Sequence, residues 1–159
     1  MPYSCLPTYP LILFGVIEPA LLIWAYITGL TSPLHFFTSQ APNPTLPPTT
    51  TFTPQAEALT LQLLNVLLLL APMSLICCWT TNSTTTKWYL IAVAFADLGH
   101  VYATYRGVGY EYFVNPSGWN DMVWGNVGVS LFLHVNRWAA VMGVFGRVGV
   151  VEGEGRKRE

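Results

Sequence analysis

Charged residues are scarce in this chain of 159 residues: they make up 9% of it, against about 25% in an ordinary soluble domain. Six of the charges fall within residues 152–159, which leaves nine for residues 1–151. So few charges cannot cover a soluble surface or form the basic footprint that binds nucleic acid. Apolar residues make up 52% of the chain, and the composition indicates an integral membrane protein that contacts the lipid bilayer and no nucleic acid.

Cysteine is also scarce, and the three that occur, Cys5, Cys77 and Cys78, exclude a disulfide framework. The histidines and cysteines show no CxxC or HxxxH spacing, so we expect no metal site. The chain also lacks GxGxxG and Walker A sequences, and we expect it to act without a cofactor.

Four hydrophobic stretches stand out, at about residues 9–30, 58–79, 88–105 and 122–146. A helix needs about 20 apolar residues to cross the hydrocarbon core of a bilayer. The prolines of residues 31–54 predict an extended loop, and the glycines and aromatics of residues 106–120 predict an ordered loop. The expected fold is all-α: an integral membrane four-helix bundle over residues 1–146, followed by a charged, glycine-rich, disordered tail over residues 147–159.

The basic residues predict the orientation of this bundle. Arg147 and the basic residues of the tail follow the fourth stretch, and Lys87 lies between the second and the third. Arg106 is alone on the opposite side. Because basic residues favour the cytoplasmic side, we expect both termini in the cytoplasm, and we expect the membrane to be that of the endoplasmic reticulum.

Ionisable residues interrupt three of the four stretches at similar depths. At about 1.5 Å per residue, Glu18 and Asp97 lie roughly 14 Å from the cytoplasmic ends of their stretches, and His134 lies roughly 18 Å from the opposite end. His100 is one helical turn from Asp97, and Arg137 is one turn from His134. Because such groups are costly inside a membrane, we expect them to face a small polar cavity within the bundle.

These residues are candidates for acid–base chemistry. A carboxylate in an apolar cavity is costly to ionise, whereas a neighbouring Arg favours the ionised form, so one protonated and one ionised carboxyl group can coexist. We interpret the ionisable groups as catalytic: Glu18, Asp97, His100 and His134. We interpret a further set of polar side chains as substrate-binding: Asn126, Arg137, Tyr26, Gln62 and Asn65.

A structural interpretation of the same residues stays open. Asp97 and Arg137 can form a buried ion pair that only fixes packing. The histidines can be satisfied by hydrogen bonds between helices, and Gln62, Asn65 and Asn126 can hold the helices together in the same way.

Three stretches together carry a resemblance to known proteins. They are LPTYPLILFGVIEPALLIWAY at 6–26, FADLGHVYATY at 95–105 and WNDMVWGNVG at 119–128. In their order and spacing the chain resembles a family of small four-span fungal membrane proteins of mostly unassigned function. Some of these are similar to small membrane hydrolases that open epoxides in aurovertin- and citreoviridin-type polyketide pathways. The resemblance implies that the functional positions of the family correspond to Glu18, Asp97, His100 and Asn126 in this chain.

The resemblance and the residues together lead to one expectation. We expect a membrane enzyme of fungal secondary metabolism that opens an epoxide, by hydrolysis or cyclisation, or isomerises a lipophilic polyketide or terpenoid. The expected partners are that lipophilic substrate, the lipid bilayer and other enzymes of the pathway. The alternative is a non-catalytic scaffold, or a protein that binds lipid or sterol in the same cavity without transferring protons.

Overall fold

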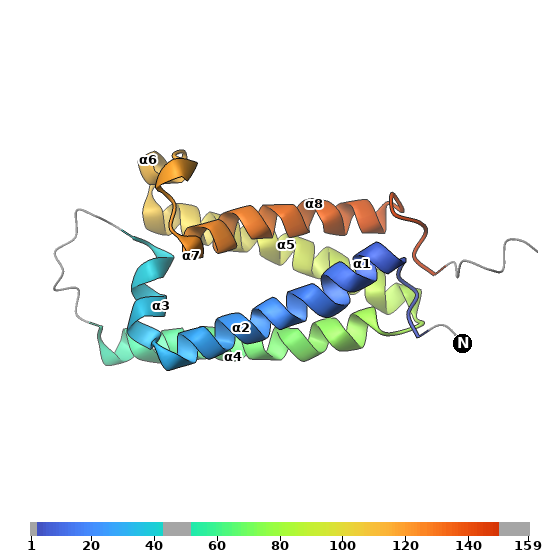
Figure 1. Ribbon diagram of the computed structural model, residues 1–159, viewed down its shortest axis with the longest axis horizontal. Coiled ribbons are helices and arrows are strands. Elements are labelled where there is room, and N and C mark those ends of the chain that lie inside the picture. The colour runs from blue at the N-terminus through green and yellow to red at the C-terminus, as the bar shows by residue number, and fades with distance from the viewer. Residues whose placement is uncertain (1–2, 43–51, 150–159) are drawn as a thin grey trace, which may run out of the picture.

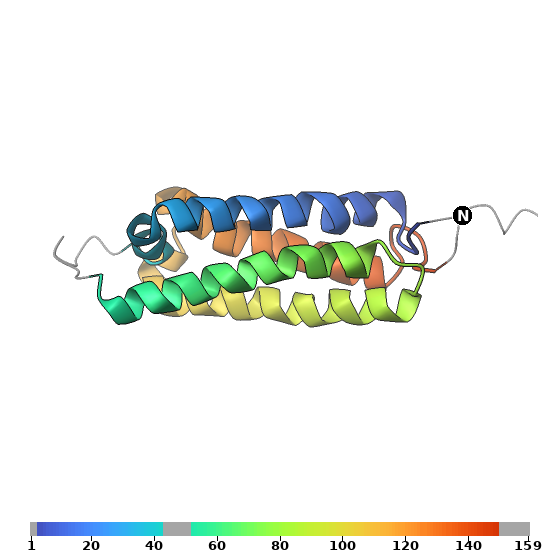
Figure 2. The ribbon, with the colours of Figure 1, turned by 90° about the horizontal axis from the view of Figure 1, so that it is seen from below.

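The computed structural model describes residues 3–42 and 52–149, and every regular element in these ranges is helical. Four long rods run side by side, and the views of Figures 1 and 2 agree on this arrangement. Two of the rods, Thr8–Thr31 and Pro54–Cys78, are long and apolar enough to cross a membrane. The all-α class is therefore confirmed for the described residues.

The first rod consists of α1 (Thr8–Ile12), a π-helical turn (Leu13–Ile17) and α2 (Glu18–Thr31). Pro19 explains the turn, because proline has no backbone N–H to donate to the carbonyl four residues before it. The amide of Glu18 donates instead to the carbonyl oxygen of Leu13, five residues before it. The rod therefore widens by one residue just ahead of the Glu18–Pro19 pair.

The second and third rods, α4 (Pro54–Cys78) and α5 (Ser83–Val108), start at side-chain caps. The Thr53 hydroxyl accepts from the amide of Ala56, and the Asn82 side chain accepts from the amides of Thr84 and Thr85. Gly109, with φ of 80°, ends α5 in a conformation that L side chains rarely adopt.

The fourth rod consists of α7 (Asp121–Val123), a second π-helical turn (Trp124–Val129) and α8 (Ser130–Val141). The side chain of Asn120 caps it by accepting from the amide of Val123 at 2.8 Å. The fourth stretch was expected to run to residue 146, but the helix ends at Val141 and Gly143 follows with φ of 81°.

The sequence predicts an extended loop over residues 31–54, and this prediction is wrong for α3 (Pro33–Gln40), which is a helix. Residues 43–51 of the segment lie outside the described residues. Proline fits the first position of a helix, where its missing N–H would have no partner, and no further proline occurs between Pro33 and Pro42. In Figure 1, α3 crosses the end of the bundle that lies far from the N-terminus. The segment 106–120 holds a short helix, α6 (Tyr110–Phe113), and a 3₁₀ turn (Pro116–Gly118).

The four rods pack as two pairs, α2 against α4 and α5 against α8 (Figure 1). The first rod also reaches the second pair near its start, where the Tyr9 hydroxyl donates to Oδ1 of Asn136 at 2.9 Å. A buried apolar cluster fills this end of the bundle: Cys5, Leu6, Leu13, Phe14, Cys78, Leu90, Ala140 and Val148.

The beginning of the expected tail belongs to this cluster. Val148 is buried, and the amide of Gly149 donates to the carbonyl oxygen of Cys5 at 2.8 Å. The prediction of a disordered tail from residue 147 is therefore wrong for residues 147–149, since an apolar side chain and a backbone hydrogen bond hold them. Its remainder, 150–159, lies outside the described residues.

Candidate functional site: a buried arginine between two carboxylates

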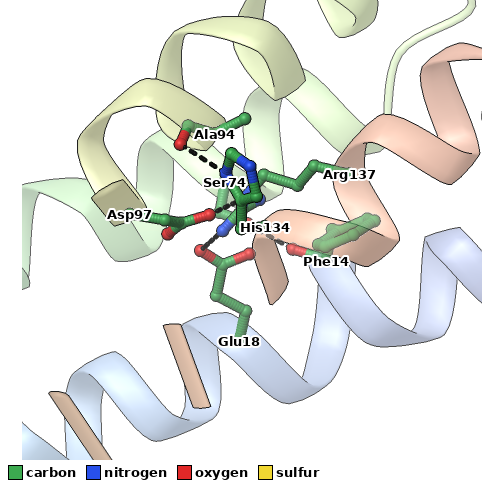
Figure 3. A network of polar contacts seen from close by, with 7 residues as sticks. All are labelled: Phe14, Glu18, Ser74, Ala94, Asp97, His134 and Arg137. Carbon is green, nitrogen blue, oxygen red and sulfur yellow. Dashed lines mark hydrogen bonds and ion pairs between the residues drawn. The ribbon is translucent and has the colours of Figure 1, made fainter. Parts of the chain in front are cut away.

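Arg137 of α8 lies between two carboxylates from two other rods (Figure 3). Its Nη2 is 2.6 Å from Oε1 of Glu18, the first residue of α2, and its Nε is 2.9 Å from Oδ2 of Asp97 in α5. The three side chains are called the triad below. The triad joins the two helix pairs through charge-assisted hydrogen bonds, which are among the stronger hydrogen bonds in proteins.

The triad is nearly sealed from solvent. The side chain of Arg137 is 1% exposed, that of Glu18 8% and that of Asp97 10%. The ring of Phe14 covers one face of the guanidinium, with its centroid 4.8 Å from Cζ. A buried cation is tolerated only when it is paired, and the two carboxylates and the aromatic face supply that pairing.

Two atoms of the triad have no hydrogen-bond partner among the residues that the structure describes. They are Oε2 of Glu18 and Nη1 of Arg137, and both are fully buried. Each therefore presents an unused acceptor or donor inside the bundle.

The end of α4 supports the backbone that carries Glu18. Pro19 has no N–H to donate to the Gly15 carbonyl, and the amide of Glu18, the usual donor to Phe14, donates to Leu13 instead. The Ser74 hydroxyl donates to the Phe14 oxygen, and the indole N–H of Trp79 donates to the Gly15 oxygen at 2.9 Å. The structure thus fixes the π-helical turn that presents the Glu18 carboxylate to Arg137.

His134 lies beside the triad, one turn before Arg137 in α8 (Figure 3). Its Nδ1 is 2.9 Å from the carbonyl oxygen of Ala94. A carbonyl oxygen only accepts, so Nδ1 carries the proton, and Nε2 is the basic nitrogen of the neutral ring.

His100 belongs to a second polar network, which links α5, the second π-helical turn and α3. Its Nε2 donates to Oδ1 of Asn126 at 3.0 Å, and Nδ2 of Asn126 donates to Oε1 of Gln40 at 2.7 Å. The Gln40 amide reaches Sδ of Met122 at 3.5 Å. This network ties α3 across the end of the bundle.

The structure brings some of the sequence-predicted residues together and separates others. Glu18, Asp97 and Arg137 meet directly, although Arg137 was assigned to substrate binding. His100 and Asn126 meet each other, apart from the triad.

Gln62 and Asn65, which the sequence assigned to substrate binding in the bundle or to contacts between helices, are exposed on the outer face of α4 instead. The buried stripe of α4 runs through Thr60, Leu64 and Ser74, and neither amide lies on it. Tyr26 is half-buried and belongs to neither network.

Sequence reasoning missed four residues that shape the site: Phe14, Gln40, Ser74 and Trp79. Ser74 had a usable signal, since a hydroxyl inside an apolar helix needs a partner. Gln40 was missed because its segment was taken to be an extended loop. Among the described residues, no three His, Cys, Asp or Glu side chains gather closely enough to hold a metal ion.

A protein-family model matches residues 3–147, a range that includes all four rods and the whole triad. Its description is a domain of unknown function, DUF7704. No curated protein matches the chain, and no solved structure does. The match spans most of the chain, which therefore belongs to the DUF7704 family.

Proposed function

We propose that this chain is a cofactor-independent membrane enzyme in which the triad performs acid–base chemistry on a lipophilic substrate. The reaction we favour is the opening of an epoxide in a polyketide or terpenoid of fungal secondary metabolism. The observation that carries the proposal is the burial of two carboxylates against one arginine within an apolar bundle.

A bundle that spans the membrane four times is part of this proposal. The third and fourth rods run alongside the two apolar rods and have similar lengths (Figure 2). They turn large apolar side chains outward, such as Phe95, Phe132 and Val135, and keep Asp97 and Arg137 inside. This pattern, with apolar residues outside and paired charges inside, is the one that a lipid environment favours.

The orientation follows from the basic residues. Lys87, near the start of α5, and Arg147, after α8, lie toward the same end of the bundle as the N-terminus. Arg106 lies near the other end of α5. We place both termini in the cytoplasm and the bundle in the endoplasmic reticulum.

Charge balance supports a proton-transfer role for the triad. Two ionised carboxylates and one guanidinium would leave a net charge of −1 in the bundle interior. One proton shared by the carboxyl groups removes that charge, and the triad then holds one acid and one base side by side. General acid–base catalysis needs both forms within reach of the substrate.

In the proposed reaction, the protonated carboxyl group gives its proton to the epoxide oxygen. The C–O bond breaks, and its electron pair goes to that oxygen. A hydroxyl oxygen forms the new bond to carbon, and its proton passes to the carboxylate. The two carboxyl groups together end with the one proton they began with, so no oxidant, reductant or metal enters the balance.

The competing role is structural. Each carboxylate already accepts a bond from Arg137, and a buried ion triad can fix helix packing without performing chemistry. A membrane scaffold or a lipid-binding protein would use the triad in this way.

Metabolite profiling with carboxamide variants separates the two roles. The gene is deleted in the producing organism and restored as wild type, Glu18→Gln or Asp97→Asn, with the protein level in membranes measured each time. Two matched controls neutralise exposed carboxylates, Glu57→Gln and Asp121→Asn. We expect an unopened precursor to accumulate on deletion and to persist in the two triad variants only. Full restoration by both triad variants would favour the structural role.

A further inference from the structure

Among the residues that the structure describes, Glu18 and Arg137 each keep one polar atom without a hydrogen-bond partner at the same buried contact. Oε2 of Glu18 only accepts hydrogen bonds while the carboxylate is ionised, and Nη1 of Arg137 only donates them. Both atoms belong to groups joined by the 2.6 Å contact between Nη2 and Oε1, so one unused acceptor and one unused donor flank the same buried ion pair (Figure 3).

The chemistry of these two atoms restricts what can bind between them. An ammonium group only donates, so it would leave Nη1 unpaired. A carbonyl, ether or epoxide oxygen only accepts, so it would leave Oε2 unpaired. A hydroxyl oxygen does both, because it donates one proton and accepts through its lone pairs. A buried group left unpaired costs about 1–3 kcal/mol, and more when it is charged, so a hydroxyl at this position removes two such costs together.

We propose that Glu18 Oε2 and Arg137 Nη1 form a binding site for one hydroxyl oxygen, which is the nucleophile of the reaction. This inference rests on the proposed function and deepens it, since it makes Glu18 the base and Asp97 the acid. Arg137 Nη1 orients the oxygen, and Glu18 Oε2 takes the proton as the new C–O bond forms. The hydroxyl comes either from water, which gives a diol, or from the substrate, which gives a cyclic ether.

Infrared difference spectroscopy tests the site without requiring turnover. The full chain is reconstituted in lipid nanodiscs and moved from ordinary water to H₂¹⁸O. We expect an ¹⁸O-sensitive O–H stretching band at a lower frequency than that of bulk water, because a hydrogen bond to a carboxylate is strong. Glu18→Gln should move the band to higher frequency, whereas Glu57→Gln, an exposed control, should leave it in place.

A second arm identifies a hydroxyl that arrives with the substrate. If the resting protein gives no such band, saturation with 1-dodecanol should produce a low-frequency O–H band that Glu18→Gln moves and Glu57→Gln does not. The absence of a band in both arms would overturn the site, and it is measured on the wild-type protein, so it depends on no variant folding.

The two proposals fail in different ways. A Glu18-dependent band together with full precursor clearance by both Glu18→Gln and Asp97→Asn would support the hydroxyl site and overturn the proposed enzymatic function. The absence of the band together with inactive carboxamide variants would support the proposed enzymatic function and overturn the proposed hydroxyl site.

Discussion

The indole N–H of Trp79 donates a 2.9 Å hydrogen bond to the carbonyl oxygen of Gly15, to which Pro19 cannot donate because it has no N–H. A side chain at the end of α4 therefore completes the backbone of the first rod beside the triad. The position of Glu18 depends on this contact, because the π-helical turn ends at that residue.

Trp79→Phe should destabilise the bundle by about 1–3 kcal/mol, because the phenyl ring removes the N–H that donates to the carbonyl of buried Gly15. Equilibrium unfolding in mixed micelles measures the effect. Trp88→Phe is the control, since Trp88 is 66% exposed. Equal losses in the two variants would contradict the assigned role of the indole hydrogen bond.

Gly15→Ala should destabilise the bundle by about 1–3 kcal/mol through overpacking. The added Cβ would lie 3.0 Å from Nε1 of Trp79 and 3.2 Å from Cβ of Cys78. At Gly99 of α5, no described atom outside the neighbouring residues and the local helix backbone lies within 4 Å of such a Cβ, so Gly99→Ala should leave the stability unchanged or raise it slightly. The same unfolding measurement compares the two alanines, and a neutral Gly15→Ala would contradict this packing.

Arg137→Met should cost about 3–5 kcal/mol, because it leaves two buried carboxylates without their cation. Adding Glu18→Leu and Asp97→Leu should recover more than half of the loss, since no buried charge then remains. Unfolding of the single and triple variants measures the difference. A triple variant less stable than Arg137→Met would show that charge pairing is not what the triad contributes.

Asn126→Leu should loosen α3, because it removes the link between His100 and Gln40. Hydrogen exchange at the amides of α3 should rise about tenfold, the factor that 1.4 kcal/mol corresponds to. Asn65→Leu changes an exposed asparagine of α4 and should leave that exchange unaltered. Unaltered exchange in Asn126→Leu would mean that other contacts hold α3.

The sequence predicts the helical class because the hydrophobic stretches and their breaks are local features. It also predicts that Glu18, Asp97 and Arg137 are interior residues, because an unpaired charge in an apolar helix costs free energy. The pair of Asp97 and Arg137 was one of the alternatives that the sequence left open. The contact of Glu18 with the same arginine was not predictable, because similar depth along separate rods does not fix which faces meet.

Other features depend on tertiary contacts that a linear pattern does not contain. Polar side chains in an apolar stretch, such as those of Gln62 and Asn65, are expected to face the interior, yet the rotation of α4 about its axis turns both outward. The two π-helical turns were not predicted either. In the first turn, carbonyl groups accept hydrogen bonds from side chains in and just after α4. The second turn positions Asn126 for its hydrogen bonds with His100 and Gln40. Pro33 was interpreted as a helix breaker where it begins a helix.

The most direct test of the central claim measures turnover in isolated membranes. The substrate is the precursor that accumulates on deletion, and the proteins compared are wild type, Glu18→Gln, Asp97→Asn and the exposed control Arg106→Lys. With equal amounts of folded protein, we predict that each carboxamide variant loses about 10²–10⁴-fold in rate while Arg106→Lys keeps the wild-type rate. Wild-type rates in both carboxamide variants would contradict acid–base chemistry at the triad.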